Sequence, residues 1–212
     1  CSSDLIHGRV TGRHGWKGET LTLKQQVGKA LSLDIGLGNP EFPAPHGDCT
    51  PTQTACLQQP AGAAKGELEV SAKQVELLVG YVKSLSPPLP RGPLDSEGQG
   101  LFVNFGCASC HIPRLPAGNK QIQPWSDLLL HELGPGLAAD NPAISGANPP
   151  ASATEWRTAP LWGVGQRNRY LHDGRAETLE AAILWHDGEA EPSRTRYEQA
   201  TKLQQERLLT FL

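Results

Sequence analysis

The sequence contains no methionine, no long hydrophobic run and no excess of positive charge. Without Met the chain has no initiator residue, so we expect it to be part of a longer protein. A membrane helix needs about 18 or more consecutive apolar residues, and no run here approaches that length. The net charge of −3 gives no basic field of the kind that attracts nucleic acid or anionic lipid, so neither partner is expected.

The first five residues, Cys1–Leu5, correspond to one reading frame of a short sequencing adapter. We expect them to be an artefact that does not belong to the fold, in the way that an expression scar does not. The rest of the chain is rich in breakers, with 23 Gly and 18 Pro over the whole sequence, which predicts many loops.

Hydrophobic periodicity predicts helices over 22–33, 71–85, 178–186 and 195–212, a short helix that begins at Ser96 and leads to Cys107, and a helical turn or two within 125–133. Ser71 with Gln74, and Ser96 with Gln99, have the spacing of capping boxes. No strand pattern survives the Gly and Pro, so we expect an all-α, loop-rich fold. The prolines after residue 86 indicate a linker, and we place a domain boundary near residue 90, which divides the chain into 1–90 and 91–212.

The segment Cys107-Ala108-Ser109-Cys110-His111 has the Cys-x-x-Cys-His spacing of c-type haem attachment. Two thiols on one helical turn can each bond a vinyl group of the same porphyrin. The histidine that follows then lies beneath the ring, where it can ligate the iron. The motif therefore predicts one covalent haem c, held by Cys107 and Cys110, with His111 as the proximal ligand.

Two other interpretations of the motif remain open. A thioredoxin-like Cys-x-x-Cys would follow a strand in a βαβ unit, and no such unit is visible here. A zinc site would need a second closely spaced Cys or Cys/His pair, whereas Cys49 and Cys56 are separated by six residues. Because c-type haem is attached in an oxidising compartment, we expect Cys49 and Cys56 to form a disulfide, the alternative being two buried thiols.

The absence of Met also removes the usual His/Met ligation of haem iron in electron carriers. Three histidines follow the motif, namely His131, His172 and His186. His186 shares one face of its predicted helix with Leu179, Ala182 and Ile183, so it is the favoured distal ligand. His172 in a tight turn is the rival, and His131 ranks third. Two histidine ligands would leave no open position on the iron, and the haem would transfer electrons.

Four linked blocks give the chain a resemblance to the di-haem oxidoreductases labelled thiol oxidoreductases, relatives of bacterial di-haem cytochrome c peroxidases. The blocks are Gly100-Leu101-Phe102 with the Cys-x-x-Cys-His motif, Asp127–Pro135, Glu155–Gly163 and Tyr170–Glu180. The resemblance implies two cytochrome c-like domains with one haem each. It also implies a distal ligand at the position of His186 and an aromatic electron bridge at Trp16, for which a packing role is the alternative. Arg157 and Arg175 have the residue type that pairs with haem propionates through charge-assisted bonds, the alternative being solvated surface arginines.

Only one haem motif is present, so we expect residues 1–90 to be the remnant of a first cytochrome c-like domain whose catalytic haem is absent from this chain. The sequence thus predicts an electron-transferring, C-terminal part of a peroxidase-like enzyme from the bacterial periplasm. The signal peptide is expected upstream, and the partner is a redox protein or a small electron donor. The alternative is an electron-transfer cytochrome c with no substrate chemistry of its own. No carboxylate cluster with calcium-ligand spacing stands out.

Overall fold

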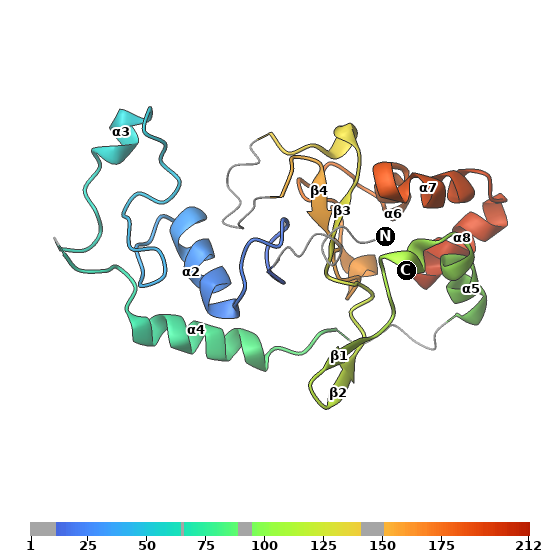
Figure 1. Ribbon diagram of the computed structural model, residues 1–212, viewed down its shortest axis with the longest axis horizontal. Helices are drawn as coiled ribbons and strands as arrows, with labels where there is room; N and C mark the ends of the chain where they lie inside the picture. The colour runs from blue at the N-terminus through green and yellow to red at the C-terminus, as the bar shows by residue number, and fades with distance from the viewer. Residues whose placement is uncertain (1–11, 65, 89–94, 141–150) are drawn as a thin grey trace. The chain divides into compact units, whose positions relative to one another are not determined.

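The computed structural model describes residues 12–64, 66–88, 95–140 and 151–212 (Figure 1). The chain divides into two compact units, of which one is Thr20–Ser86 and the other combines Cys1–Glu19 with Pro87–Leu212. The predicted boundary near residue 90 and the expected artefact at residues 1–5 lie outside the described residues. The division into two cytochrome c-like domains therefore stays a prediction.

The unit Thr20–Ser86 is built around two helices, α2 (Leu23–Leu33) and α4 (Ala72–Ser84), which pack against each other. Both predicted helices are confirmed. Each begins with a complete capping box, formed by Thr22 and Gln25 in α2 and by Ser71 and Gln74 in α4. The short helix α3 (Thr54–Leu57) comes between them in the sequence and contains Cys56. The predicted disulfide between Cys49 and Cys56 is confirmed.

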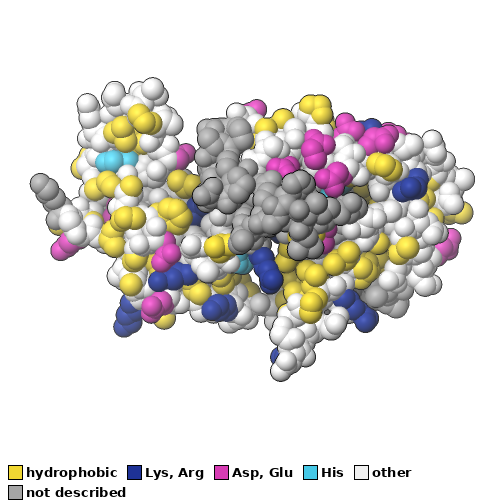
Figure 2. Space-filling model, viewed as in Figure 1, with side chains coloured by type: hydrophobic (Ala, Val, Ile, Leu, Met, Phe, Trp, Pro, Cys, Tyr) yellow, Lys and Arg dark blue, Asp and Glu magenta, His cyan; other side chains and the backbone are white. Residues whose placement is uncertain are grey.

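The apolar face predicted for α4 is largely exposed. Val75 is fully buried, but Leu78, Val82 and Leu85 are exposed, as is Tyr81. Figure 2 shows apolar and charged side chains mixed over this part of the surface. The periodicity therefore predicted the helix correctly and the burial of its stripe incorrectly.

The core of the larger unit lies between α5 (Ser96–Asn104) and α8 (Lys202–Phe211), the two helices with the most extensive mutual contact. Its buried residues are Leu101, Phe102, Phe105, Tyr197 and Leu208. The N-cap of α5 is Asp95, whose carboxylate accepts from the Glu97 amide, so the predicted cap at Ser96 is wrong by one residue.

The predicted C-terminal helix 195–212 is interrupted. Two helices stand in its place, α7 (Glu191–Glu198) and α8, and Thr201 caps the second with Gln204 in a capping box. The polar Gln204, at the third position of α8, therefore marks the start of a helix within the segment predicted as one continuous helix. The remaining helical elements are α6 (Leu179–Leu184) and the 3-10 turns η1 (Cys107–Ser109), η2 (Pro135–Leu137), η4 (Val164–Gln166) and η5 (Gly188–Ala190).

Four short strands within the described ranges correct the expectation of an all-α fold. The hairpin of β1 (Leu115–Ala117) and β2 (Lys120–Ile122) turns at Gly118-Asn119, where Gly118 has φ +60°. The second pair joins β3 (Leu130–Glu132) to β4 (Glu155–Arg157) and places His131 opposite Trp156. The helical turns predicted within 125–133 are replaced by a loop and β3. The loop-rich, mainly helical character is confirmed.

Within the part of the chain that the structure describes, no helix combines the length and the apolar character needed to cross a membrane.

Candidate functional site

A cavity of about 380 Å³ opens beside η1 in the larger unit. Most of its walls are apolar, and it is lined by the proposed haem-binding residues Cys107, Cys110, His111 and Arg157 and by the two leading candidates for distal ligand, His172 and His186. His131, Trp16 and Trp156 also reach the cavity, whereas Arg175 does not. The volume falls within the range of small-molecule and cofactor sites.

The two thiols are placed by a sharp turn at the end of α5. Gly106 has φ +90°, a left-handed conformation that favours glycine, and a Cβ on it would also crowd the Ser193 hydroxyl at 2.9 Å. The turn continues into η1, where the amide of His111 donates to the Cys107 carbonyl at 2.9 Å. Cys107 and Cys110 are free and half-buried, and burial raises the pKa of the Cys107 thiol to about 11.

The imidazole of His111 is fixed by one hydrogen bond. Its Nδ1–H donates to the carbonyl of Trp125 at 2.9 Å, which leaves Nε2 as an acceptor. Trp125 adopts a left-handed φ of +52°, and its ring packs edge-on against Phe102 and Phe211 at 5.5 Å. Burial lowers the pKa of His111 to about 4, so the ring is neutral, as a metal ligand must be.

His186 has the same arrangement. The helix α6 ends at Leu184, before the predicted end at residue 186, and His186 follows the C-cap Trp185. Its Nδ1–H donates to the Ala182 carbonyl at 2.7 Å, and burial lowers its pKa, so Nε2 is again a neutral acceptor. No hydrogen bond to either Nε2 is found within the described residues. His111 and His186 thus both keep Nε2 available as a ligand atom at the cavity.

His172 is held by stacking. Its ring lies 3.7 Å from that of Trp156 with an interplanar angle of 17°, and Nζ of Lys17 lies 3.4 Å from the centroid of the same indole. The Trp156 Nε1–H donates to the Leu137 carbonyl at 2.8 Å. These contacts hold the His172 ring at the cavity wall, and its Nε2 lies 3.9 Å from a carboxylate oxygen of Asp173.

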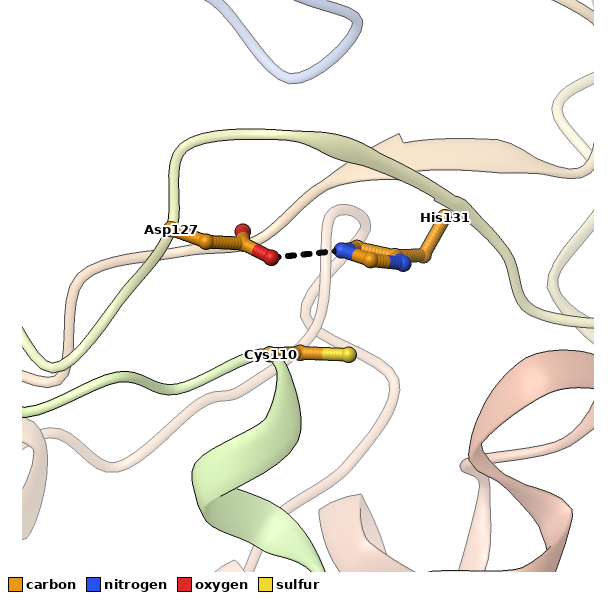
Figure 3. Close-up of side chains that lie close together, drawn as sticks. All are labelled: Cys110, Asp127 and His131. Atoms are coloured by element: carbon orange, nitrogen blue, oxygen red, sulfur yellow. Dashed lines mark hydrogen bonds and ion pairs between the residues drawn. The ribbon is translucent and has the colours of Figure 1, made fainter. Parts of the chain in front are cut away.

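His131 is paired with two acidic residues. Nε2 lies 2.9 Å from a carboxylate oxygen of Asp127 (Figure 3). Nδ1 lies 2.9 Å from a carboxylate oxygen of Glu189. Burial opposes the charged ring, but the hydrogen bonds that the ring donates to Asp127 and Glu189, together with its interaction with Cys110, outweigh this effect and raise the pKa of His131 to about 11. The ring is an imidazolium with both nitrogens occupied, and it is unsuited to ligate iron.

Donor atoms of Cys110, Asp127 and His131 lie within 4.8 Å of one another, as in a small metal site (Figure 3). The carboxylates already satisfy both ring nitrogens of His131, and Cys110 is the second thiol of the haem motif. The cluster is therefore better explained as a hydrogen-bonded network beside the motif than as a separate metal centre.

Arginine side chains supply positive charge at the cavity. Arg157 donates through Nε to the Gly15 carbonyl at 2.8 Å, and Arg196 donates through Nη1 to the Phe105 carbonyl at 3.1 Å. Nε of Arg194 is buried and has no hydrogen-bond partner among the described residues. Arg175 lies elsewhere, bonded to Asp173 and the Gly136 carbonyl.

Arg194 and Arg196 were missed by sequence reasoning. Only the contact of α7 with the Gly106 turn brings them to the cavity, and no local pattern shows that contact.

The residues present fit a covalently bound c-type haem. Two thiols on one turn, two imidazole acceptors and an unpaired buried guanidinium N–H meet at one mainly apolar cavity, and these groups correspond to the vinyl groups, iron and propionates of a haem.

A family comparison decides the kind of protein. The family described as "Di-haem oxidoreductase, putative peroxidase" matches residues 7–212. The chain belongs to the di-haem oxidoreductase family. The resemblance recognised from the four sequence blocks is thereby confirmed, and with it a haem-based redox function.

Among curated proteins, this di-haem oxidoreductase is similar to the methylamine utilization protein MauG of Paracoccus denitrificans. The two are 24% identical over 213 residues, covering 85% of this chain and 55% of MauG, so the chain spans about half the length of that relative. Among solved structures it is similar to Kuenenia stuttgartiensis hydrazine synthase pressurised with xenon, with a TM-score of 0.49 and 19% identity over 68% of this chain and 56% of that one.

Proposed function

We propose that this chain carries one covalent haem c in a cytochrome c-like fold and transfers electrons as the C-terminal part of a di-haem peroxidase-like oxidoreductase. Cys107 and Cys110 form the thioether bonds, His111 is the proximal ligand and His186 the distal ligand. One observation carries the proposal: His111 and His186 line the same cavity, each with Nδ1–H bonded to a carbonyl and Nε2 left as acceptor.

The protein groups each have a defined task. When bound, a c-type haem would supply a one-electron couple, and His111 and His186 together would leave the iron no open position for substrate. The carbonyls of Trp125 and Ala182 fix the tautomer and orientation of the two ligands, as hydrogen bonds to metal-bound histidines commonly do. Arg157 and Arg196 would offer guanidinium groups to the propionates, as would the buried Nε–H of Arg194, whose Nη2 lies 3.4 Å from a carboxylate oxygen of Asp187. The apolar walls would exclude water. Arg175 bonds its own turn and remains a weaker candidate.

We propose that Trp16 takes part in the electron route to a second haem in the intact protein. It lines the cavity, its side chain is 43% exposed, and its carbonyl accepts the Arg157 amide at 2.9 Å. The peroxidase-like activity, the periplasmic location and the redox partner, a protein or a small donor, belong to the same proposal for the whole protein.

A second candidate function is that of an electron-transfer cytochrome c without substrate chemistry. The single Cys-x-x-Cys-His motif and the two candidate ligands at one cavity favour it for this chain taken alone. The two functions differ in whether the intact protein contains a second haem to which this haem passes electrons.

The test uses the chain expressed through a periplasmic haem-attachment pathway. We expect a mass increase of one haem, lost when both Cys107 and Cys110 are replaced by Ala. The ferrous protein should reduce an oxidised cytochrome, and it should not sustain peroxide turnover in the presence of a reductant. Sustained turnover by this chain would contradict the relay function, and absence of covalent haem would contradict the whole proposal.

A further inference from the structure

The buried side chain of His131 connects the two segments that carry the proposed iron ligands. It is 2% exposed and lies on β3, a strand that contains neither ligand. Its two ring nitrogens each meet a carboxylate at 2.9 Å, Asp127 on one side and Glu189 on the other. A buried imidazolium with two anionic acceptors is a strong junction, because each bond is charge-assisted.

Asp127 is attached to the segment that contains the proposed proximal ligand, His111. Its backbone amide donates to the Cys110 carbonyl at 2.8 Å, and the Ser126 amide donates to the Ile112 carbonyl at 3.0 Å. Trp125, two residues before Asp127, supplies the carbonyl that holds the His111 ring. The loop that ends at Asp127 is therefore bonded along the segment that contains His111.

Glu189 is part of the segment that follows the proposed distal ligand, His186. It lies in η5, three residues after His186, and its second carboxylate oxygen accepts the Glu132 amide at 3.1 Å. The segment is also closely packed, because a Cβ on Gly188 would meet a carboxylate oxygen and the carbonyl of Glu132. The chain that follows His186 is thereby attached to β3.

We propose that His131 is a positioning residue. Through Asp127 and Glu189 it ties the segment that carries His186 to the loop that orients His111, and so it keeps the distal imidazole on the iron. The inference rests on the proposed haem ligation. It assigns to His131 a role other than that of a ligand. Glu189 lies in the segment that follows His186, and none of its described bonds reaches the loop that orients His111. Loss of Glu189 should therefore release the segment of His186 while that loop keeps its own bonds.

The experiment compares Glu189→Ala with wild type in the haem-loaded protein, using cyanide binding to the ferric haem as the probe. Cyanide must displace the distal ligand, so its binding rate reports how often His186 leaves. The substitution removes the charge-assisted bond from His131 and the bond from the Glu132 amide, and this loss should raise the rate about tenfold. The covalent haem content and the low-spin resting spectrum should be unchanged.

Two variants give the comparison its meaning. Glu198→Ala removes an exposed carboxylate from the neighbouring helix α7 and should bind cyanide at the wild-type rate. Glu189→Gln keeps an amide oxygen that can accept from His131, and it should restore most of the slow binding. The expected order is therefore fast cyanide binding for Glu189→Ala and slow binding for Glu189→Gln, Glu198→Ala and wild type. A loss of folding stability alone would not be reversed by the amide oxygen of Glu189→Gln.

The failures of the two proposals are distinguishable. A wild-type chain without covalent haem, or with a high-spin ferric spectrum, would overturn the proposed ligation. A low-spin wild type in which Glu189→Ala binds cyanide no faster than Glu198→Ala would overturn the role of His131 and leave the ligation intact.

Discussion

Replacement of Lys17 by Met should destabilise the larger unit strongly. Lys17 is 8% exposed, and its ammonium group donates to three backbone carbonyls, those of Ser152, Ala153 and Glu155, at 3.0, 2.8 and 2.6 Å. It also lies 3.4 Å from the centroid of the Trp156 ring. One side chain therefore binds residues 152–156, which lead into β4 and the cavity wall.

The magnitude follows from the groups left behind. A buried carbonyl that loses its donor is destabilising by about 1–3 kcal/mol, and a cation–π contact contributes about 0.5–2 kcal/mol. Burying the ammonium already opposes folding by several kcal/mol, which offsets part of the loss. We expect Lys17→Met to lower the free energy of unfolding by about 2–4 kcal/mol.

Tryptophan fluorescence is the matching assay. All five Trp residues, Trp16, Trp125, Trp156, Trp162 and Trp185, lie in the unit that contains Lys17, so a urea titration followed by fluorescence reports on that unit. Lys202→Met is the control, because Lys202 is 83% exposed and its ion pair to Glu180 spans 3.9 Å. A loss for Lys17→Met no larger than that of the control would refute the reasoning.

The effect should also depend on pH. Burial lowers the pKa of Lys17 from 10.5 to about 8, with Glu155 and Glu19 acting in the opposite direction. Between about pH 8 and 10.5 the unfolded chain then binds more protons than the folded one, so the stability of the wild type rises across this window. Lys17→Met lacks that gain, and the difference in unfolding free energy between the two proteins should be larger at pH 10 than at pH 7.

Three further predictions concern the core, the disulfide and a helix cap. Phe102→Ala should lower the free energy of unfolding by about 3–5 kcal/mol in the fluorescence assay, because Phe102 is 2% exposed and packs against Trp125. Replacing Cys49 and Cys56 together by Ser should destabilise the Thr20–Ser86 unit by about 2 kcal/mol, seen as faster amide hydrogen exchange in α2 and α4, with an unchanged fluorescence transition. Thr201→Ala should remove about 1 kcal/mol through loss of the α8 cap, and a change below about 0.3 kcal/mol would contradict the capping box.

Local signals in the sequence predicted the local features of the structure. The capping box of Ser71 and Gln74 marks the start of α4, and the apolar spacing before Cys107 marks α5, because both depend on residues within one or two turns. The hairpin at Gly118-Asn119 also had a local signal, a two-residue Gly-Asn turn, which the strongly exposed flanking residues obscured.

Long-range contacts had no such signal. The pairing of β3 with β4 joins segments more than twenty residues apart, and the bond between His131 and Glu189 spans 58 positions. The sequence therefore presented His131 as a third candidate ligand, whereas the structure shows both of its nitrogens bound to carboxylates. Likewise, Arg175 has the residue type that suits a propionate, but it binds its own turn at Asp173.

The most direct test of the account is the ferric absorption and electron paramagnetic resonance spectrum of the haem-loaded chain, compared with those of His186→Ala and His172→Ala. Bis-histidine ligation predicts a low-spin spectrum for wild type and for His172→Ala, and a high-spin spectrum for His186→Ala. A high-spin wild type, or a His186→Ala variant that stays low-spin while His172→Ala becomes high-spin, would contradict the assignment of His186 as the distal ligand.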